Sequence, residues 1–222
     1  MDLSYTEENY LKAIYLLSLD KPDGVNTNDI AEEMNTKASS ATDMIKKLHK
    51  KSMLDYKAYQ PVKITETGKK TAIKVLRKHR LWEKFLFDKL GFEWHEVHEI
   101  AEELEHIKSE KLIIKLDSFL GHPTHDPHGD PIPDREGNIE HHTDFTIADL
   151  RESQFGMVIG LKDTSPDFLK YLDESGLTLG KSVRIEKFNE YDRSMNVIVN
   201  MENRLSITDR VAKNIYIKKL TR

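Results

Sequence analysis

The stretch HRLWEKFLFDKLGFEWHEVHEIAEELEH, residues 79–106, carries two runs with helical spacing and many side chains that can bind metal. On the first run His79 and Glu83 are four residues apart, so both project from one side of a helix. On the second run four possible ligands share a stripe about 100° wide. They are His98, Glu102, Glu105 and His106. The stretch predicts one helix ending near Lys89 and another over 94–107, with ligands gathered on one side.

The composition is typical of a soluble globular protein. The chain has 222 residues, 38% hydrophobic and 8% aromatic, which is enough for ordinary cores. It has no apolar run of about 18 residues, and its first residues are acidic where a signal peptide is basic, so we expect a cytoplasmic protein without a membrane segment. Because cysteine is absent, any metal must be held by His, carboxylate, amide or backbone oxygen, which favours harder ions such as Mn(II) or Fe(II).

Charge is distributed unevenly along the chain, although the net charge is only -4. Residues 37–80 hold 13 Lys and Arg against three acids, whereas residues 81–222 hold 19 basic and 27 acidic residues. A local excess of this kind suits a polyanion, so residues 37–80 are the candidate for nucleic-acid binding.

The N-terminal segment has the pattern of a winged helix-turn-helix. A capped amphipathic helix is predicted over 4–19, and two short helices over 27–35 and 39–56 face each other across a break at Asn35 and Thr36. Residues 55–72 then indicate a two-stranded hairpin that turns near Gln60 and Pro61, followed by a Thr65-containing cap into the next helix.

In such a module the second helix enters the major groove and the wing lies along phosphate. The second helix begins with small and hydroxylated residues, which allow close backbone approach but read few bases, so phosphate contact should dominate the affinity. The candidate DNA-binding residues are Thr27, Lys37, Ser39, Ser40, Thr42, Asp43, Lys46, Lys47 and Lys57. A solvated helix face is the alternative interpretation of the lysines, and the helix-turn-helix context favours DNA binding over it.

The rest of the chain predicts a third helix, a tether and a small β domain. The helix covers 109–120, and residues 121–144 hold four of the seven prolines and three of the ten glycines, which indicates an irregular connection. From residue 145 the runs VRIEKF, MNVIVNM and NIYIKKL predict strands of a small barrel, and a short helix begins at Pro166 after Ser165.

Three motifs resemble the diphtheria-toxin-repressor family of metal-dependent transcriptional regulators. They are RKHRLWE at 77–83, VHEIAEELEH at 97–106 and HGDPIP at 128–133. The resemblance covers nearly the whole chain and implies a multidomain, mainly α-helical protein with a small β domain. Its parts would be a winged helix-turn-helix over 1–72, a helical dimerisation and metal domain over 73–140 with a tether over 121–144, and an SH3-like barrel over 145–222.

The resemblance also implies two metal sites in each subunit. One would use His79, Glu83 and His98, and the regulatory site would use Glu102, Glu105 and His106 with a ligand from the first helix, where Asn9 stands in place of the usual Met or Asp and Glu8 is a possible substitute. Glu at position 102 implies Mn(II), with Fe(II) as the alternative. Further candidate ligands come from the tether and the C-terminal domain: Asp126, His128, and Asp163 or Asp167.

We therefore predict a homodimeric, non-enzymatic repressor of metal uptake that binds double-stranded operator DNA and takes no organic small-molecule substrate. Two other classes stay open at this point. Glu and His around a metal can activate water, as in a metal-dependent hydrolase, although no separate general acid or nucleophile motif is present. A regulator that senses an organic ligand and uses metal only structurally has the same spacing. The ligand stripe can also be a solvated helix face, but its presence on two helices argues against that.

Overall fold

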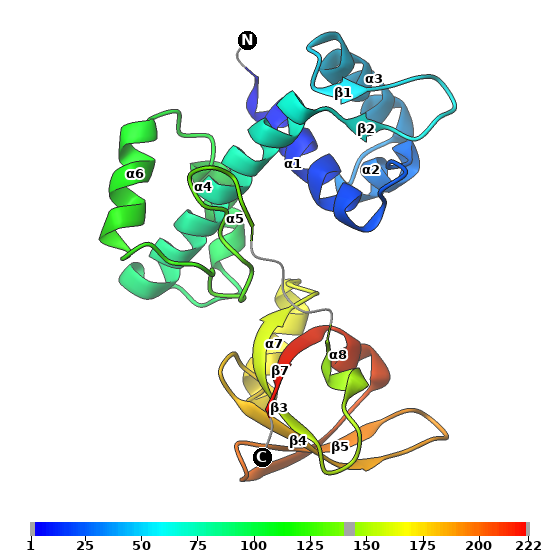
Figure 1. Cartoon of the computed structure of the whole chain (residues 1–222), viewed down its shortest axis with the longest axis vertical. Helices are drawn as coiled ribbons and strands as arrows, with labels where there is room; N and C mark the ends of the chain where they lie inside the picture. Colours follow the sequence, from blue (N-terminus) through cyan, green and yellow to red (C-terminus); the bar gives the residue numbers. More distant parts are fainter. Residues whose placement is uncertain (1–2, 140–144, 221–222) are drawn as a thin grey trace. The chain divides into compact units, whose positions relative to one another are not determined.

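The computed structural model describes residues 3–139 and 145–220, so the last residues of the predicted tether, 140–144, lie outside the described part. The chain forms two compact units, and one of the boundaries between them falls inside the long helix α4 (Glu66–Leu90), which Figure 1 labels. The first unit comprises Met1–His79, Glu102–Ile114 and Pro133–Asn138, and the second comprises Arg80–Ala101, Lys115–Ile132 and Ile139–Arg222.

Helix α1 (Tyr5–Asp20) begins at a capping box, as the sequence predicts. The Ser4 hydroxyl accepts a hydrogen bond from the Glu7 backbone N–H (3.3 Å), and the Glu7 carboxylate accepts one from the Ser4 N–H (2.7 Å). These bonds satisfy two N–H groups that the first helical turn leaves without partners. Leu11 and Ile14 are fully buried on the inner face of the helix.

The winged helix-turn-helix is confirmed. The two helices turn at Asn35, which adopts a left-handed backbone conformation with φ of 45°. Behind them a short antiparallel hairpin forms the wing. The elements are α2 (Thr27–Glu33), α3 (Ala38–Lys50), β1 (Leu54–Asp55) and β2 (Lys63–Ile64).

Three further helices follow: α4 (Glu66–Leu90), α5 (Val97–Leu104) and α6 (Glu110–Phe119). The Thr65 hydroxyl caps α4 by accepting from the Gly68 N–H at 3.0 Å. The predicted 94–107 helix is too long, because α5 starts later and ends earlier. The Ile107 N–H bonds the Leu104 carbonyl (3.1 Å), an i to i−3 bond that closes the helix, so Glu105 and His106 lie in the turn beyond it.

The C-terminal segment forms a five-stranded antiparallel sheet in the order β6-β5-β4-β3-β7 (Figure 1). Its strands are β3 (Phe155–Leu161), β4 (Ser182–Phe188), β5 (Met195–Val199), β6 (Asn203–Ile207) and β7 (Ile215–Lys219). Short helices accompany it: η1 (Ile147–Asp149), α7 (Pro166–Ser175) and α8 (Asp209–Lys213). The predicted small β domain is confirmed, although the predictions included neither β3 nor β6.

Trp94 belongs to the buried core of this β domain, together with residues of the strands and of α7. Its indole N–H donates to the Asp173 carboxylate at 2.7 Å. The segment before α5 is thereby held by the C-terminal sheet unit. None of the helices in the described ranges combines the length and the apolar character that crossing a membrane requires.

Candidate metal centres and nucleic-acid interface

A cluster of charged side chains within the first unit joins α1 to the end of α5. The Lys12 ammonium lies 2.5 Å from a Glu102 oxygen and 2.7 Å from a Glu105 oxygen. His79 contacts the same Glu105 carboxylate, with its Nδ1 at 2.7 Å. His79, Glu102 and Glu105 each offer a ligand atom within 4.8 Å of the others, so they form one group that can hold a cation.

His106 is held in the same cluster by α1. Its Nδ1 lies 2.6 Å from a Glu8 carboxylate oxygen, and the Tyr5 ring stacks on the imidazole at 4.5 Å. Because a carboxylate can only accept, Nδ1 carries the proton of a neutral ring, and Nε2 keeps its lone pair for a metal. Glu8 therefore orients His106 in the way that carboxylates orient metal-binding histidines.

Two buried oxygens of this cluster have no hydrogen-bond partner among the described residues. They are Oδ1 of Asn9 and Oε1 of Glu105. The Asn9 amide N–H donates instead to Glu102 at 3.2 Å, which directs its oxygen elsewhere. Burial alone raises the pKa of Glu105, but hydrogen bonds and charge from His79 and Lys12 lower it overall, so this carboxylate is ionised. Unpartnered amide and carboxylate oxygens beside an ionised group fit a hard divalent cation.

The second cluster lies within the second unit and is almost wholly buried. Glu83 is 2% exposed, Asp126 4% and His128 2%, and each offers a ligand atom within 4.8 Å of the others. Asp126 Oδ2 is buried and has no hydrogen-bond partner in the part of the chain that the structure describes. Burial, reinforced by the charges of Asp130 and Glu83, raises the pKa of Asp126 well above its usual value. A divalent cation would reverse that effect, so the residues fit a metal.

The ring of His128 is positioned for metal binding. Its Nε2 lies 2.8 Å from the Trp94 carbonyl oxygen, which can only accept, so Nε2 carries the proton. Nδ1 of the neutral ring is then the lone-pair atom, and it lies 3.9 Å from the Glu83 carboxylate. Histidines that bind a metal through one ring nitrogen usually donate the N–H of the other to a carboxylate, a backbone carbonyl or water.

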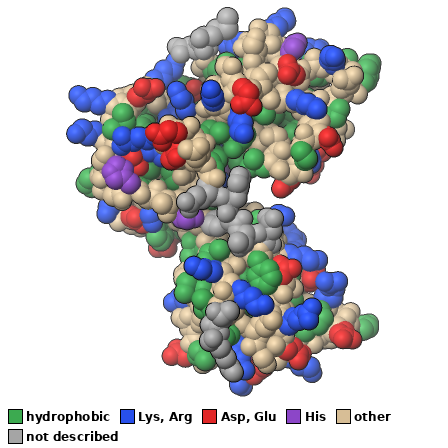
Figure 2. Space-filling model, in the orientation of Figure 1, with side chains coloured by type: hydrophobic (Ala, Val, Ile, Leu, Met, Phe, Trp, Pro, Cys, Tyr) green, Lys and Arg blue, Asp and Glu red, His purple; other side chains and the backbone are tan. Residues whose placement is uncertain are grey.

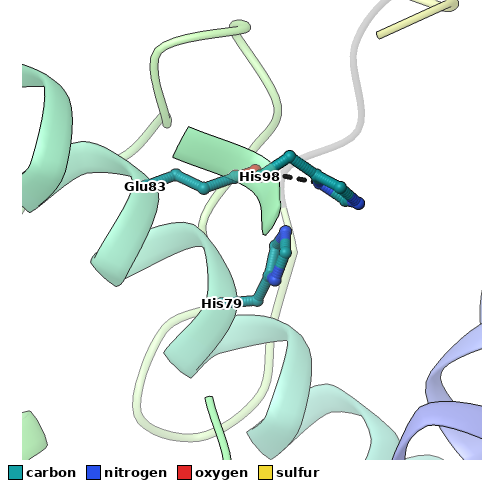
Figure 3. Close-up of side chains that lie close together, drawn as sticks. All are labelled: His79, Glu83 and His98. Carbon is teal, nitrogen blue, oxygen red and sulfur yellow. Dashed lines mark hydrogen bonds and ion pairs between the residues drawn. The ribbon is translucent and has the colours of Figure 1, made fainter. Parts of the chain in front are cut away.

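Glu83 also contacts His98, which the resemblance assigns to the same site. Figure 3 shows His79 and Glu83 on successive turns of α4, with His98 bonded to Glu83 through Nδ1 at 3.2 Å.

The tether is held against the C-terminal sheet by a glycine. Gly129 has φ of +85°, and a Cβ at this position would lie 2.3 Å from the Ile159 carbonyl oxygen and 2.7 Å from Gly160 Cα. The adjacent turn is closed by Asp126 Oδ1, which accepts the N–H groups of His128 (2.8 Å) and Asp130 (2.9 Å). This close packing fixes the positions of the Asp126 and His128 ligand atoms.

The C-terminal carboxylates proposed as further ligands lie just before α7 and in its first turn. Asp163 accepts the Ser165 N–H at 2.9 Å, which shapes the turn before α7, and Asp167 is exposed in the first turn of that helix. Neither takes part in any of the ligand groups found among the described residues.

The candidate DNA-binding residues lie on α3, at its start, on α2 and on the wing. Thr27 and Thr42 are half-buried. The exposed residues are Lys37, Ser39, Ser40, Asp43, Lys46, Lys47 and Lys57. Lys47 also approaches Glu7 at 3.4 Å, and Lys51 pairs with the same buried carboxylate at 2.8 Å. On the face seen in Figure 2, basic and acidic side chains are interspersed.

Lys12 is the site residue that the sequence reasoning missed. It stands three residues after Asn9 on α1, so both lie on one helix face, and that spacing was the available signal. Its partners are 90 and 93 residues away in the chain, which local patterns do not predict.

The structure defines a class of DNA-binding protein with candidate metal centres. It combines a winged helix-turn-helix, metal-ligand groups of His and carboxylate, and a small β domain. Three family models match the chain and describe the same class of protein. "Iron dependent repressor, N-terminal DNA binding domain" matches residues 2–62, "Iron dependent repressor, metal binding and dimerisation domain" matches 65–134, and "FeoA domain" matches 145–219. The SH3-like character predicted for the last domain is thereby confirmed, while the predicted boundaries after residues 72 and 144 stay predictions.

The chain belongs to the diphtheria-toxin-repressor family of metal-dependent regulators. A solved manganese-dependent transcriptional repressor in complex with manganese is 31% identical, with TM-score 0.87 over 96% of this chain and 100% of that one. A helix-turn-helix-type regulator of Methanocaldococcus jannaschii is 34% identical over 53% of this chain and 94% of its own. The iron-dependent repressor IdeR of Mycobacterium tuberculosis is 34% identical over 60% of this chain, and the match spans 57% of that repressor's length.

Proposed function

We propose that the protein is a metal-dependent transcriptional repressor that binds operator DNA as a homodimer when Mn(II) is plentiful. The observation that carries this proposal is the cluster between α1 and the end of α5. It connects the first helix of the DNA-binding module to Glu102, Glu105 and His106, with ligand oxygens of Asn9 and Glu105 left unpartnered among the described residues.

In this function Asn9, Glu102, Glu105 and His106 would hold the ion, which supplies positive charge between the carboxylates. Glu8 keeps the His106 lone pair on Nε2, and the α1 capping box fixes the helix that carries Asn9. Holding α1 against residues 102–106 restricts the motions open to the DNA-binding module. If the DNA-competent arrangement binds metal more tightly, metal shifts the population toward it, and DNA tightens metal binding by the same factor.

Manganese is favoured by the chemistry of the ligands. The first group consists of carboxylate and imidazole ligands with the amide of Asn9, and the second of carboxylate and imidazole ligands alone. Carboxylate and carbonyl oxygens suit Mn(II). The manganese-dependent solved relative supports the same choice. Fe(II) is the second candidate, because the mycobacterial relatives are named iron-dependent repressors and ferrous iron accepts similar ligands.

Exposed apolar side chains at the end of α4 and on α6 provide a surface for a second copy. Phe87 is 40% exposed, Leu90 56% and Phe119 65%, and Phe119 packs edge-on against Phe85. Apolar side chains of this size gathered on two neighbouring helices are typical of an oligomer interface. A repressor of this kind works where the chromosome is, so we place it in the cytoplasm.

The proposal is tested by fluorescence anisotropy of operator-length DNA with Mn(II), with anaerobic Fe(II) and with chelator. We expect binding to tighten by about 5- to 150-fold with the physiological metal, the range of typical allosteric coupling. Equal affinity in chelator and in metal would contradict the sensor function, and metal-dependent turnover of a phosphoester would favour the hydrolase instead.

Replacing Lys47 with alanine should weaken DNA binding similarly for all sequences and lower the log-log salt slope by about one unit, as expected for one lost phosphate contact. The fold should survive, because Glu7 keeps its 2.8 Å ion pair with Lys51. Anisotropy titrations over a range of salt measure the slope, with Lys170→Ala, an exposed lysine of α7, as the matched control. An effect confined to one operator sequence would show that Lys47 reads bases.

A further inference from the structure

Lys12 lies among the ligand residues between α1 and the end of α5. The Lys12 side chain is about 8% exposed, and its ammonium lies 2.5 Å from Glu102 Oε1 and 2.7 Å from Glu105 Oε2. Both carboxylates are ligands in the proposed function. In this structure, the positive charge between the two carboxylates is therefore the ammonium group of Lys12.

We propose that Lys12 is an internal competitor for the metal and sets the metal concentration at which the protein responds. This inference rests on the proposed function. The Lys12 ammonium and a divalent ion compete for the same carboxylate oxygens, and like charges a few ångströms apart repel strongly where water is scarce. Metal binding then requires Lys12 to leave Glu102 and Glu105, and the lost ion pairs subtract from the metal affinity.

The composition of α1 makes this competition stronger. Asn9 is neutral and Lys12 is positive, and the two stand three residues apart on one face of the helix. The negative charge that α1 brings to the cluster comes from Glu8, which is engaged with His106 at 2.6 Å. The carboxylates of Glu102 and Glu105 are thus partly neutralised before any ion arrives.

A purely structural lysine has a different expected consequence. If Lys12 only supported the fold, its removal would leave two poorly compensated carboxylates, destabilise the protein and weaken or leave unchanged the metal affinity. A competitor predicts two opposite changes. In the absence of metal, the variant without Lys12 is less stable, because its carboxylates have lost their cation. The same variant binds the metal ion more tightly, because the freed carboxylates regain a cation only from the metal.

The experiment titrates the full chain with Mn(II) by isothermal calorimetry and measures Tm in chelator. We expect Lys12→Met to tighten one class of Mn(II) site by at least roughly tenfold, while the other class keeps its affinity, and to lower Tm in chelator. Lys21→Met is the matched control, since Lys21 pairs with Asp29 at 2.6 Å and touches neither carboxylate group. That control should leave both Mn(II) affinities unchanged.

Lys12→Gln keeps a hydrogen-bond donor for the carboxylates but loses the charge, so it should show the same tightening and serves if Lys12→Met does not fold. Unchanged or weaker Mn(II) binding by the folded variants, with normal binding by the wild type, would overturn the competitor role and leave the proposed function standing. A wild-type protein that binds no Mn(II) or Fe(II) would overturn the proposed function and the competition with it.

Discussion

Gly129→Ala is expected to destabilise the protein by about 3 kcal/mol and to weaken metal binding at the second cluster. The added Cβ would lie 2.3 Å from the Ile159 carbonyl oxygen and 2.7 Å from Gly160 Cα, and both belong to the backbone of β3. Backbone in the middle of a sheet cannot move aside cheaply, so the tether must lift away from the strand. Asp126 and His128, which flank this turn, would move with it.

Urea unfolding gives the loss of stability, and Mn(II) titration gives the affinity of each class of site. Gly121→Ala is the matched control, because Gly121 also has a left-handed φ of +76° but a Cβ there would meet nothing within 4 Å. It should cost only the backbone strain, about 1 kcal/mol, and leave metal binding intact. Equal effects of the two substitutions would show that contact with β3 does not support the second cluster.

The parts of the fold that the sequence predicts well depend on local rules. The Ser4 and Glu7 capping box, the break at Asn35 and the Thr65 cap each involve residues a few positions apart. Their side chains bond the backbone of their own segment, so neighbouring residues alone decide the outcome. The helix-turn-helix and the start of α4 follow from such rules.

The features that escaped prediction depend on partners far along the chain or on weak local patterns. Strand β3 contains two glycines, and β6 is largely exposed, so neither has the alternating apolar pattern of a typical strand. They are strands because they pair with β7 and β5.

The sequence predicts the types of residue in the candidate site, but it predicts less well which of these residues lie together. A regular helix over 94–107 placed Glu105 and His106 on the stripe with His98, but α5 ends at Leu104. Contacts with α1 then decide where both side chains point. His79 shows the same limit, because it meets Glu105 as well as standing one turn before Glu83.

Glu102→Ala should abolish the metal-dependent part of DNA binding while the protein stays folded. Loss of a residue that only orients a ligand weakens metal binding roughly 10- to 100-fold, and loss of a direct ligand should weaken it at least as much. The fold should persist because the Glu102 side chain is 31% exposed and Lys12 keeps its 2.7 Å contact with Glu105. The Asn9 amide, which loses Glu102 as its acceptor, is only half-buried and can bond water.

Anisotropy titrations with Mn(II) and with chelator, together with Mn(II) calorimetry, measure both effects. Glu103→Ala is the matched control, since Glu103 is the next residue of α5, carries the same charge and is exposed. It should keep the full metal response and so separate the loss of a ligand from the loss of one negative charge near the cluster. A Glu102→Ala protein with an unchanged metal response would remove Glu102 from the ligand set, and the unpartnered oxygens of Asn9 and Glu105 would then need another explanation.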